Sequence, residues 1–361
     1  MKRSLKIVAG LVVCIAALGI LAGCNRGKTA KAAGLDLKTI YAGIGDEETH
    51  FSTRDIPLPT ANRNYKIGVA LYSVESGFFK ALQDVAISEI QATGATVLIA
   101  NCDGNVTTQV SQIENFITQG VDAIIAEPAD PASALNLTLR KVYDAGIPVV
   151  AFDMPFDPGA PHMTSVVTDG YGLGTAVGKE VARQLLRDHP TGTIEYGIIG
   201  GIEGAAQPMS RNNGFQDGIK SVDTGGRIKM VSWLFPGDFT EEGGLRLAEN
   251  MLVAHPNIKC LIGTSDPQVV GASAVLRRLG KTDVMLAACD GSRTASENMV
   301  NGGPIKILGI NSPVEAAKLT VRMLVQVLNG GPAPKSKLTF MEPFLVTVDN
   351  IKEYYDPNSA F

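Results

Sequence analysis

Short apolar strands alternate with amphipathic helices through most of this chain, and few folds accommodate that alternation. Residues 66–72 are almost continuously apolar, as are strands buried on both faces of a parallel sheet. The segment that follows has apolar residues at helical spacing, among them Leu82, Val85, Ala86 and Ile90. Strands that alternate with helices of roughly 10 to 17 residues indicate βαβ units and parallel sheets covered by helices.

The alternation occurs twice, over residues 65–152 and 193–329, and the two halves have similar lengths. We therefore predict the α/β class, with two doubly wound parallel-sheet lobes. Ligands of open α/β sheets bind beyond the carboxyl ends of the strands, so two lobes that face each other along those edges enclose a cleft. The predicted strands are 66–72, 96–100, 123–126, 147–152, 193–200, 228–234, 258–263, 284–289 and 305–310, and the predicted helices are 77–93, 106–119, 131–144, 210–222, 240–254, 269–279, 295–300 and 313–329.

Residues 1–24 have the pattern of a lipoprotein signal peptide. Lys2 and Arg3 precede an apolar run over 7–21, which is shorter than the roughly 20 residues that span a bilayer. The run ends in Leu-Ala-Gly-Cys24, which resembles the lipobox whose cysteine is acylated and becomes the new N-terminus. An uncleaved anchor with an incidental cysteine is the alternative. We expect export and a lipid anchor at Cys24 on the bacterial cell envelope, in the periplasm or at the cell surface.

Residues 25–64 show no persistent helical or strand period, and we predict a tether between the anchor and the lobes. A flexible chain of about 40 residues has an end-to-end distance of roughly 30–40 Å. Within it, residues 35–41 are a candidate segment for docking on the folded body.

Charge and cysteine content exclude several classes of protein. The chain has 32 basic and 36 acidic residues, a net charge of −4, and no basic stripe, so we expect no nucleic-acid partner. Of the five cysteines, Cys102, Cys260 and Cys289 belong to the predicted lobes, and no two share a CxxC spacing. Buried free thiols are favoured over a disulfide.

The sequence contains no recognisable catalytic or cofactor motif. Glycines over 170–178 approximate a dinucleotide loop, but Thr175 and Val177 stand where GxGxxG requires glycine. A glycine-rich helix start packed against a strand accounts for them better. The four histidines are scattered, without the spacing of metal ligands. We predict that the protein is not an enzyme and binds neither metal nor cofactor.

Polar residues stand instead at the ends of predicted strands in both halves. Ser73, Asp153, Asp266, Asp290 and Asn311 occupy such positions, and a pair of phenylalanines begins the first helix. A single aspartate of this kind is usually a helix cap or a turn residue. Five polar residues on two lobes, with aromatic rings nearby, are typical of a sugar site, which needs hydrogen-bonding groups and apolar faces.

From residue 65 to about residue 355 the chain resembles the ribose- and galactose-type periplasmic binding proteins, the solute receptors of ABC importers. The segments that carry this resemblance are 67–79, 146–153, 214–216, 254–257 and 289–291. The resemblance implies the type I fold, a monomer, and three crossings between lobes, at 168–169, at 311–312 and near 340–343. The N-terminal lobe would comprise 65–168 and 312–341, and the C-terminal lobe 169–311 and 342–361.

The resemblance also implies a set of ligand-binding residues. Ribose receptors carry arginines where this chain has Met154 and Met209, although Arg211 stands only two residues beyond Met209, and the sequence therefore disfavours ribose. A deoxy, methylated or otherwise less hydroxylated sugar or polyol fits better. The implied set is Tyr72, Ser73, Ser76, Phe78, Phe79, Asp153, Met154, Met209, Phe239, Ser265, Cys289, Asp290 and Asn311.

Two functions remain open from the sequence. The first is a lipid-anchored receptor that captures a small sugar-like solute and delivers it to an ABC permease in the membrane. The second is a sensor that presents a sugar or diol-like signal to a membrane kinase or chemoreceptor.

Overall fold

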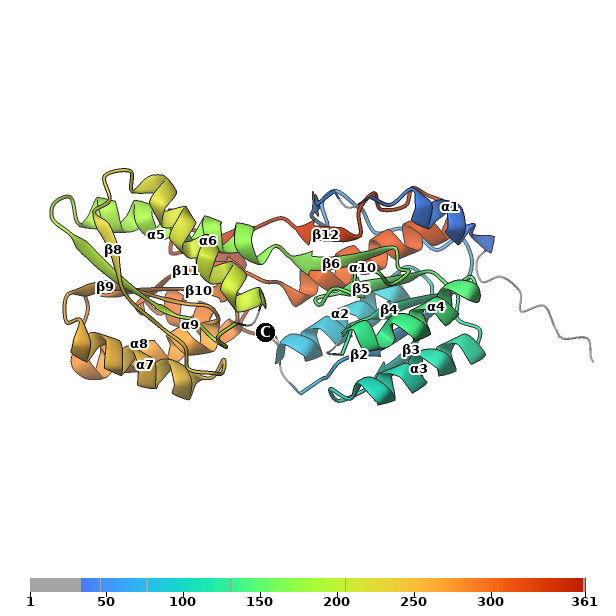
Figure 1. Ribbon diagram of the computed structural model, residues 1–361, viewed down its shortest axis with the longest axis horizontal. Coiled ribbons are helices and arrows are strands. Elements are labelled where there is room, and N and C mark those ends of the chain that lie inside the picture. The colour runs from blue at the N-terminus through green and yellow to red at the C-terminus, as the bar shows by residue number, and fades with distance from the viewer. Residues whose placement is uncertain (1–33, 46, 76, 130–131, 205, 360) are drawn as a thin grey trace, which may run out of the picture. The chain divides into compact units, whose positions relative to one another are not determined.

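The computed structural model of the protein describes residues 34–45, 47–75, 77–129, 132–204, 206–359 and 361, which belong to one compact unit (Figure 1). Two sheets organise it, and we call the two halves built on them the N-terminal and C-terminal lobes. The signal peptide, Cys24 and Ser76 lie outside the described residues. The mixed α/β class with parallel sheets confirms the predicted fold class.

The N-terminal lobe contains a seven-stranded, fully parallel sheet in the order β1-β12-β6-β5-β4-β2-β3. Its strands are β1 (Thr49–Phe51), β2 (Lys66–Leu71), β3 (Thr96–Asn101), β4 (Ala123–Ala126), β5 (Val149–Phe152), β6 (Thr164–Thr168) and β12 (Leu338–Met341). Its helices are α1 (Leu37–Ala42), α2 (Gly77–Ala92), α3 (Val106–Thr118), the 3-10 helix η2 (Ala132–Leu135), α4 (Asn136–Asp144) and α10 (Pro313–Leu328).

The C-terminal lobe contains a six-stranded sheet in the order β13-β11-β10-β9-β7-β8, parallel except for the edge strand β13. Its strands are β7 (Ile194–Ile199), β8 (Ile228–Leu234), β9 (Ile258–Gly263), β10 (Met285–Asp290), β11 (Ile305–Ile310) and β13 (Phe344–Thr347). Its helices are α5 (Gly170–Asp188), α6 (Ala206–Val222), α7 (Glu241–Ala254), α8 (Asp266–Leu279), α9 (Arg293–Val300) and α11 (Ile351–Tyr354).

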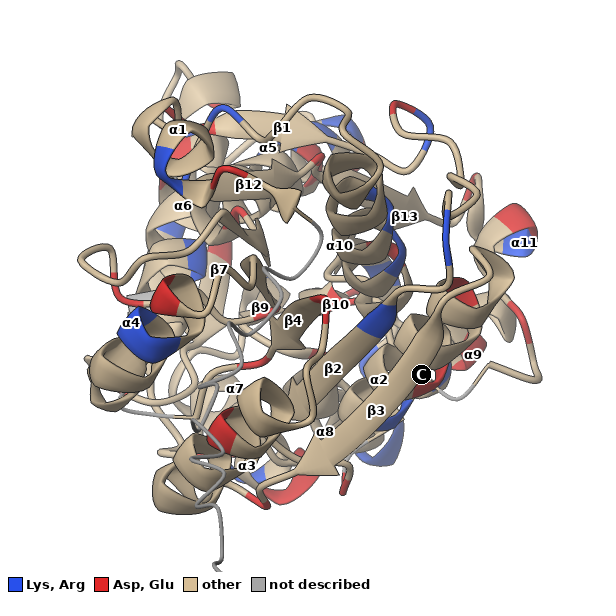
Figure 2. Cartoon of the chain, turned by 90° about the vertical axis from the view of Figure 1, so that its right-hand side faces the viewer, with Lys and Arg blue, Asp and Glu red and all other residues tan. Residues whose placement is uncertain are grey.

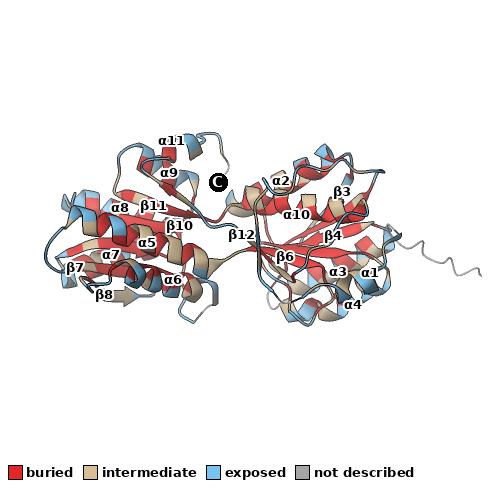
Figure 3. Cartoon of the chain, turned by 90° about the horizontal axis from the view of Figure 1, so that it is seen from above, coloured by how far each residue is buried: buried red, intermediate tan, exposed pale blue. Residues whose placement is uncertain are grey.

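Both faces of the central strands are covered, which explains their apolar sequences. Every residue of β4 and of β5 is buried, and Figure 3 shows the strands largely as buried and the outer faces of the helices as exposed. Charged residues lie chiefly on helices and loops, while strands such as β3 and β12 carry none (Figure 2). The hydrophobic effect therefore holds each sheet between its helices.

The glycines of α5 permit an unusually close approach to α6. A Cβ atom at Gly174 would lie 2.3 Å from the backbone oxygen of Arg211, and one at Gly178 would lie 2.2 Å from that of Phe215. This segment also packs against a strand, as the sequence interpretation expected, because Leu173 and Val177 contact β11 at Gly309, while the glycines themselves face α6. The glycine contact fixes the position of α6 and of Arg211 on it.

The chain passes between the two sheets three times. It leaves the first sheet after β6, returns to α10 after β11, and leaves again between β12 and β13. Thr168, at the end of β6, donates a 2.5 Å hydrogen bond from Oγ1 to Oδ1 of Asn311, which follows β11. Two of the crossings are thus joined to each other by side chains.

The described part of segment 25–64 differs from the predicted tether. Strand β1 pairs with β12 at the edge of the N-terminal sheet, Leu37 is buried, and Ile40 and Tyr41 pack against the core of that lobe. Arg322 of α10 also donates hydrogen bonds to two backbone oxygens of this segment. Its apolar residues follow no single period because they reach the core from a helix, a short strand and irregular turns.

Cys102, Cys260 and Cys289 are free and buried, as the sequence predicted. Among the described residues, no helix combines the length and the apolar character that crossing a membrane requires.

Candidate functional site

Six polar side chains gather where the strands of both sheets end, and we call them the polar cluster. Glu127 and Asp153 follow β4 and β5 in the N-terminal lobe. In the C-terminal lobe, Asp266 begins α8 directly after β9 and Asp290 ends β10. Asn311, which follows β11, and Arg211, on α6, complete the cluster. The carboxyl edge of a parallel sheet is where α/β folds bind ligands.

Charge interactions connect the two halves of the polar cluster. Burial raises the pKa of Asp153 to about 6, the positive charge of Arg211 opposes that rise, and the negative charge of Asp290 adds to it. Because these interactions require proximity, the carboxyl group of Asp153 faces the Arg211–Asp290 pair of the other lobe.

Arg211 is the cation of this cluster, and its side chain is only 3% exposed. Its Nη1 donates 2.9 Å hydrogen bonds to Asp290 Oδ1 and to the backbone oxygen of Thr264. Its Nε and Nη2 are buried without a hydrogen-bond partner in the described part of the chain. A guanidinium group carries five donor hydrogens, so this one retains donors for a bound molecule.

Asp266 offers an acceptor in the same region. Its Oδ2 accepts hydrogen bonds from the backbone nitrogens of Gly291, at 2.9 Å, and Ser292, at 2.6 Å. Its Oδ1 is buried and has no hydrogen-bond partner in the described part of the chain. Burial, and secondly the charge of Asp290, raises the pKa of Asp266 to about 7.

Asn311 connects Asp290 to the chain crossings. Its side chain hydrogen-bonds to Asp290, while its Oδ1 accepts from Thr168. Burial raises the pKa of Asp290, against the effect of the nearby Arg211 charge. The carboxyl group of Asp290 is therefore held from two sides, by a cation and by an amide.

Two aspartates of the cluster have backbone conformations that residues other than glycine rarely adopt. The φ angle is 64° at Asp153 and 149° at Asp290, and among the described non-glycine residues only Asp103 also has a positive φ. Such conformations cost free energy and concentrate at binding and catalytic sites, where they aim a side chain. Their occurrence in both lobes supports a binding role for this cluster.

Glu127 and Asp153 form a pair of carboxyl groups in hydrogen-bonding contact. Glu127 is fully buried, and its Oε2 accepts a 3.0 Å hydrogen bond from the backbone nitrogen of Tyr72. Burial, and secondly the charge of Asp153, raises the pKa of Glu127 to about 8. Burial and the neighbouring carboxyl group thus both favour the protonated form of Glu127.

Aromatic rings lie beside this pair at the start of α2. Phe79 contacts Tyr72 edge-on, with ring centroids 5.6 Å apart, and contacts Phe78 with centroids 5.7 Å apart. Phe78 also contacts Phe361, at 5.2 Å. These rings provide an apolar surface next to Tyr72, whose backbone nitrogen is bonded to Glu127.

The other predicted ligand residues have varied surroundings. Ser73 is buried and accepts a hydrogen bond from the backbone nitrogen of Glu75, and Met154 is half-buried next to Asp153. Phe239 is 38% exposed and packs against Gly201.

Two predicted residues belong to the framework of the C-terminal lobe, and a third lines a pocket. Ser265 is the N-cap of α8, and its backbone nitrogen donates a 3.2 Å hydrogen bond to Oε1 of Gln268. Cys289 is fully buried in the core of the lobe, where its thiol lies near the charge of Arg211. Met209 lines a surface pocket with Tyr171 and Asp217 on the outside of α5 and α6.

Sequence reasoning missed three residues of the polar cluster as ligand contacts. Glu127 directly follows an apolar strand, which is the signal that identified Asp153. Asp266 was noted as a strand-end residue but not included in the ligand-binding set. Arg211 was noted only as an arginine two residues beyond Met209 and was not included in the ligand-binding set, because its position depends on how closely α6 packs against α5.

The cluster mixes buried donors with buried acceptors from two lobes. Hydroxyl groups, which both donate and accept, can satisfy such a mixture, and the adjacent rings suit C–H surfaces. Among the described residues, no group of three or more histidine, cysteine, aspartate or glutamate side chains is arranged to hold a metal ion.

Comparisons with known proteins place the chain among solute-binding proteins. A family model described as a periplasmic binding protein domain matches residues 67–332. Over 290 residues the chain is 26% identical to a D-apiose import binding protein of Actinobacillus succinogenes, an alignment that covers 80% of this chain and 90% of that protein.

Two solved structures are similarly close. A solute-binding protein of an ABC transporter from Mycobacterium smegmatis, with bound glycerol, is 27% identical and has a TM-score of 0.67, covering 82% of this chain and 99% of that one. A counterpart from Bacillus halodurans, with bound myo-inositol, is 26% identical and has a TM-score of 0.66, covering 81% and 97%.

Proposed function

The chain belongs to the family of periplasmic binding protein domains, whose members here are sugar-binding proteins of ABC transporters, and from this we propose that it captures a small neutral sugar or polyol between its lobes. It then delivers the solute to the permease of an ABC importer. The polar cluster is the binding site, and the rings of Tyr72, Phe78 and Phe79 cover one face of the ligand.

The observation that carries this proposal is the set of unsatisfied buried groups in the cluster. Arg211 Nε and Nη2, together with Asp266 Oδ1, have no hydrogen-bond partner in the described part of the chain. A buried polar group without a partner costs about 1–3 kcal/mol. Ligand hydroxyl groups that satisfy these atoms regain that free energy, which gives the site affinity for a polyhydroxylated solute.

The identity of the solute depends partly on Arg211. The sequence argument against ribose counted two missing guanidinium groups, at Met154 and Met209. Arg211 supplies one buried guanidinium group two residues beyond Met209, so only the guanidinium group expected at Met154 is missing. D-Ribose therefore belongs in the set of solutes to be tested, beside D-apiose, glycerol, myo-inositol and deoxy sugars.

Attachment to the membrane is a further part of the proposal. Cys24 would carry the lipid after the signal peptide is removed, which keeps the receptor at the cell envelope beside its permease. The proposal treats the protein as a monomer with one site for ligand.

A thermal-shift screen over those solutes tests the binding function. A solute at 100 times its dissociation constant adds about 2.7 kcal/mol to the free energy of unfolding, which raises the melting temperature by several degrees. We expect at least one sugar or polyol to do so, and calorimetric titration to give one ligand per chain. A flat screen over all of these compounds would refute the sugar site.

Delivery to a permease is tested in cells. Deletion of the gene should abolish uptake of the radiolabelled solute found in the screen, and expression of the full chain should restore it. Unchanged uptake, accompanied by loss of a transcriptional or motile response to that solute, would instead identify the protein as a sensor.

A further inference from the structure

Glu127 has no exposed surface, yet it carries an ionisable group next to the ligand-facing Asp153. One of its oxygens accepts from Tyr72, and the other, Oε1, receives no donor hydrogen from any described residue. Its carboxyl group is nevertheless within hydrogen-bonding distance of Asp153. Two carboxylates are both acceptors, so this contact becomes a hydrogen bond only if one of them holds a proton.

The surroundings assign that proton to Glu127. Its neighbours are the uncharged amide of Gln109, which donates to the backbone oxygen of Glu127, and the backbone of Tyr72. Asp153 faces Arg211 of α6 and Asp290 of β10, so its charge is partly balanced from the other lobe. A cation near Asp153 and none near Glu127 favour an ionised Asp153 and a protonated Glu127.

We propose that Glu127 is a positioning residue that donates a proton to Asp153 and thereby holds the Asp153 carboxylate in its ligand-binding orientation. The proposal rests on the proposed function, because it concerns the same site, and it extends that function to a dependence on pH. When Glu127 loses its proton, two negative charges meet in a buried contact, and Asp153 is pushed away from the ligand.

The strained backbone of Asp153 makes this support necessary. At a φ of 64° the residue holds a conformation that costs free energy and persists only if its surroundings favour it. A hydrogen bond to a charged acceptor is among the stronger ones in proteins, and it can offset such a cost. Loss of the proton removes the bond and adds repulsion at the same time.

The pH dependence of folding stability reports on the protonation of Glu127 in the absence of ligand. The pKa of Glu127 is about 8 in the folded chain and about 4.3 in an unfolded one, so the folded state binds an extra proton between those values. Stability from this group is therefore fully present at acid pH and is lost as the pH rises toward about 8. Glutamine cannot titrate, so the melting temperature of Glu127→Gln should rise relative to wild type between pH 5 and pH 9.

The matched control is Glu114→Gln, an exposed position on α3 in the same lobe, where Glu114 pairs with Lys141. Its melting temperature relative to wild type should stay constant across the same pH range. The infrared difference spectrum between wild type and Glu127→Gln at pH 7 should contain the carbonyl band of a protonated carboxyl group, and the difference spectrum between wild type and Glu114→Gln should lack it. Absence of this band from the first difference spectrum would overturn the assignment of the proton.

The second arm measures affinity for D-apiose, D-ribose, glycerol and myo-inositol at pH 7 and pH 9. If binding requires neutral Glu127, the competent fraction falls from roughly 0.9 to roughly 0.1, and wild-type affinity falls about tenfold. Glu127→Gln should show less than about a twofold change over that range. An equal fall of affinity in wild type and in Glu127→Gln would assign the pH dependence to other residues and refute the positioning role.

The two experiments distinguish a failure of this inference from a failure of the proposed sugar-binding function. If none of the four solutes binds, the sugar site fails, while the pH dependence of stability still tests the proton. Should Glu127→Gln not fold, Asp153→Asn serves instead. It removes the charge that raises the pKa of Glu127, so the loss of stability should begin at lower pH, and an unshifted profile would contradict the pair.

Discussion

Thr168 donates a 2.5 Å hydrogen bond to Asn311 across two of the three chain crossings, and Asn311 in turn hydrogen-bonds to Asp290. The segments between the lobes are thus connected to the candidate site through one amide side chain. Closure of two lobes around a ligand is a hinge motion, and hinge residues absorb the backbone change. A side chain that bonds to both the hinge and the site couples the two.

Thr168→Val keeps the shape of the side chain and removes this hydrogen bond. The amide of Asn311 then loses one of its fixed partners and holds Asp290 less firmly. A hydrogen bond contributes about 0.5–1.5 kcal/mol, so we expect a 2- to 10-fold loss of affinity for the solute found in the screen. Thr118→Val is the control, since Thr118 donates only to the exposed end of its own helix. Equal affinity in both variants would show that the crossings act independently of the site.

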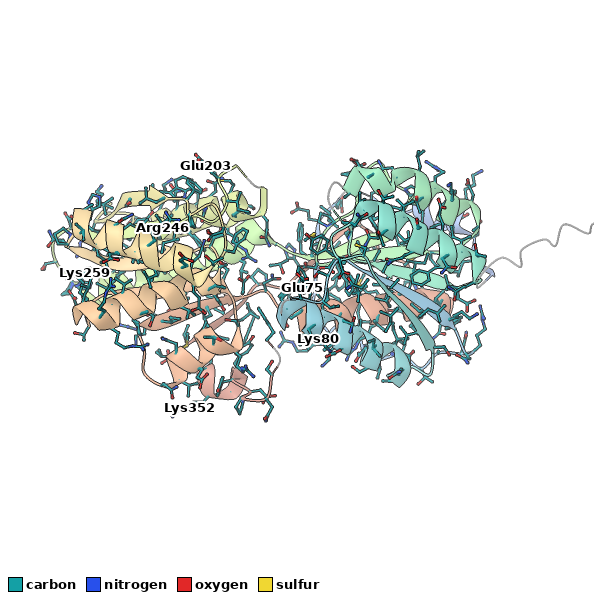
Figure 4. All side chains as sticks on the ribbon, turned by 90° about the horizontal axis from the view of Figure 1, so that it is seen from below. Glu75, Lys80, Glu203, Arg246, Lys259 and Lys352 are labelled. Carbon is teal, nitrogen blue, oxygen red and sulfur yellow. The ribbon has the colours of Figure 1, made fainter. Side chains whose placement is uncertain are left out.

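Asp290→Ala removes a carboxylate that the ligand contacts in our proposal. A hydrogen bond to a charged group contributes about 1.5–3 kcal/mol, so affinity should fall by about 10- to 150-fold. Asp84→Ala provides the comparison, because Asp84 pairs with Lys80 on the outside of α2, where Figure 4 labels the lysine. If calorimetry finds unchanged affinity in Asp290→Ala and only a lower melting temperature, the residue is structural.

Arg211→Lys tests the geometry of the buried guanidinium group. Lysine keeps the positive charge beside Asp290, but it loses the planar fork whose Nε and Nη2 are available to the ligand. We expect most of the folding stability to remain, while affinity drops by at least about tenfold. Arg278→Lys, at an exposed pair with Glu249, should leave both quantities near wild type. Full affinity in Arg211→Lys would mean that only the charge matters.

Gly174→Ala tests the close approach of α5 and α6. The new Cβ would meet the backbone oxygen of Arg211 at 2.3 Å, so the helices must separate. Overpacking of this kind costs about 1–3 kcal/mol, and it also displaces Arg211. Gly225→Ala, where nothing lies within 4 Å of the new atom, should be neutral in thermal unfolding. A melting temperature equal to wild type in Gly174→Ala would refute the helix contact.

Cys24→Ala should abolish lipid attachment and leave the precursor unprocessed. Each buried CH₂ of an acyl chain contributes about 0.8 kcal/mol, so two or three chains hold the protein firmly at a membrane. Metabolic labelling with a fatty-acid probe and fractionation of cells measure both effects. Absence of label on the wild-type protein would exclude the anchor.

The sequence predicted the parallel sheets because buried strands leave an unmistakable apolar run, as in β4 and β5. It also placed Asp290 and Asn311 together, because β10 and β11 end at the same edge of one sheet, and it placed Asp153 at the corresponding edge of the other sheet. Arg211 could not be found in this way, since it lies on a helix whose depth depends on Gly174. The docking of residues 35–41 was expected from the sequence, but the pairing of β1 with β12 was not, because a three-residue strand leaves no recognisable period.

Glu127 is a different kind of omission. Its position after β4 was visible in the sequence, but its burial and its contact with Asp153 depend on strands that are distant along the chain. A lone glutamate after a strand is usually exposed, so nothing local distinguished it. Only the arrangement of β4 beside β5 brings the two carboxyl groups into contact.

The docked N-terminal segment shortens the connection between Cys24, the proposed lipid site, and the folded body. With the described part of residues 34–64 on the N-terminal lobe, only residues 25–33 lie between them. Nine residues span at most about 32 Å even when fully extended, against about 140 Å for the 40 residues of the whole segment. A receptor anchored at Cys24 would therefore stay within a thin layer above the bilayer. Insertion of flexible residues after Cys24 would widen that layer and dilute the receptor around its permease.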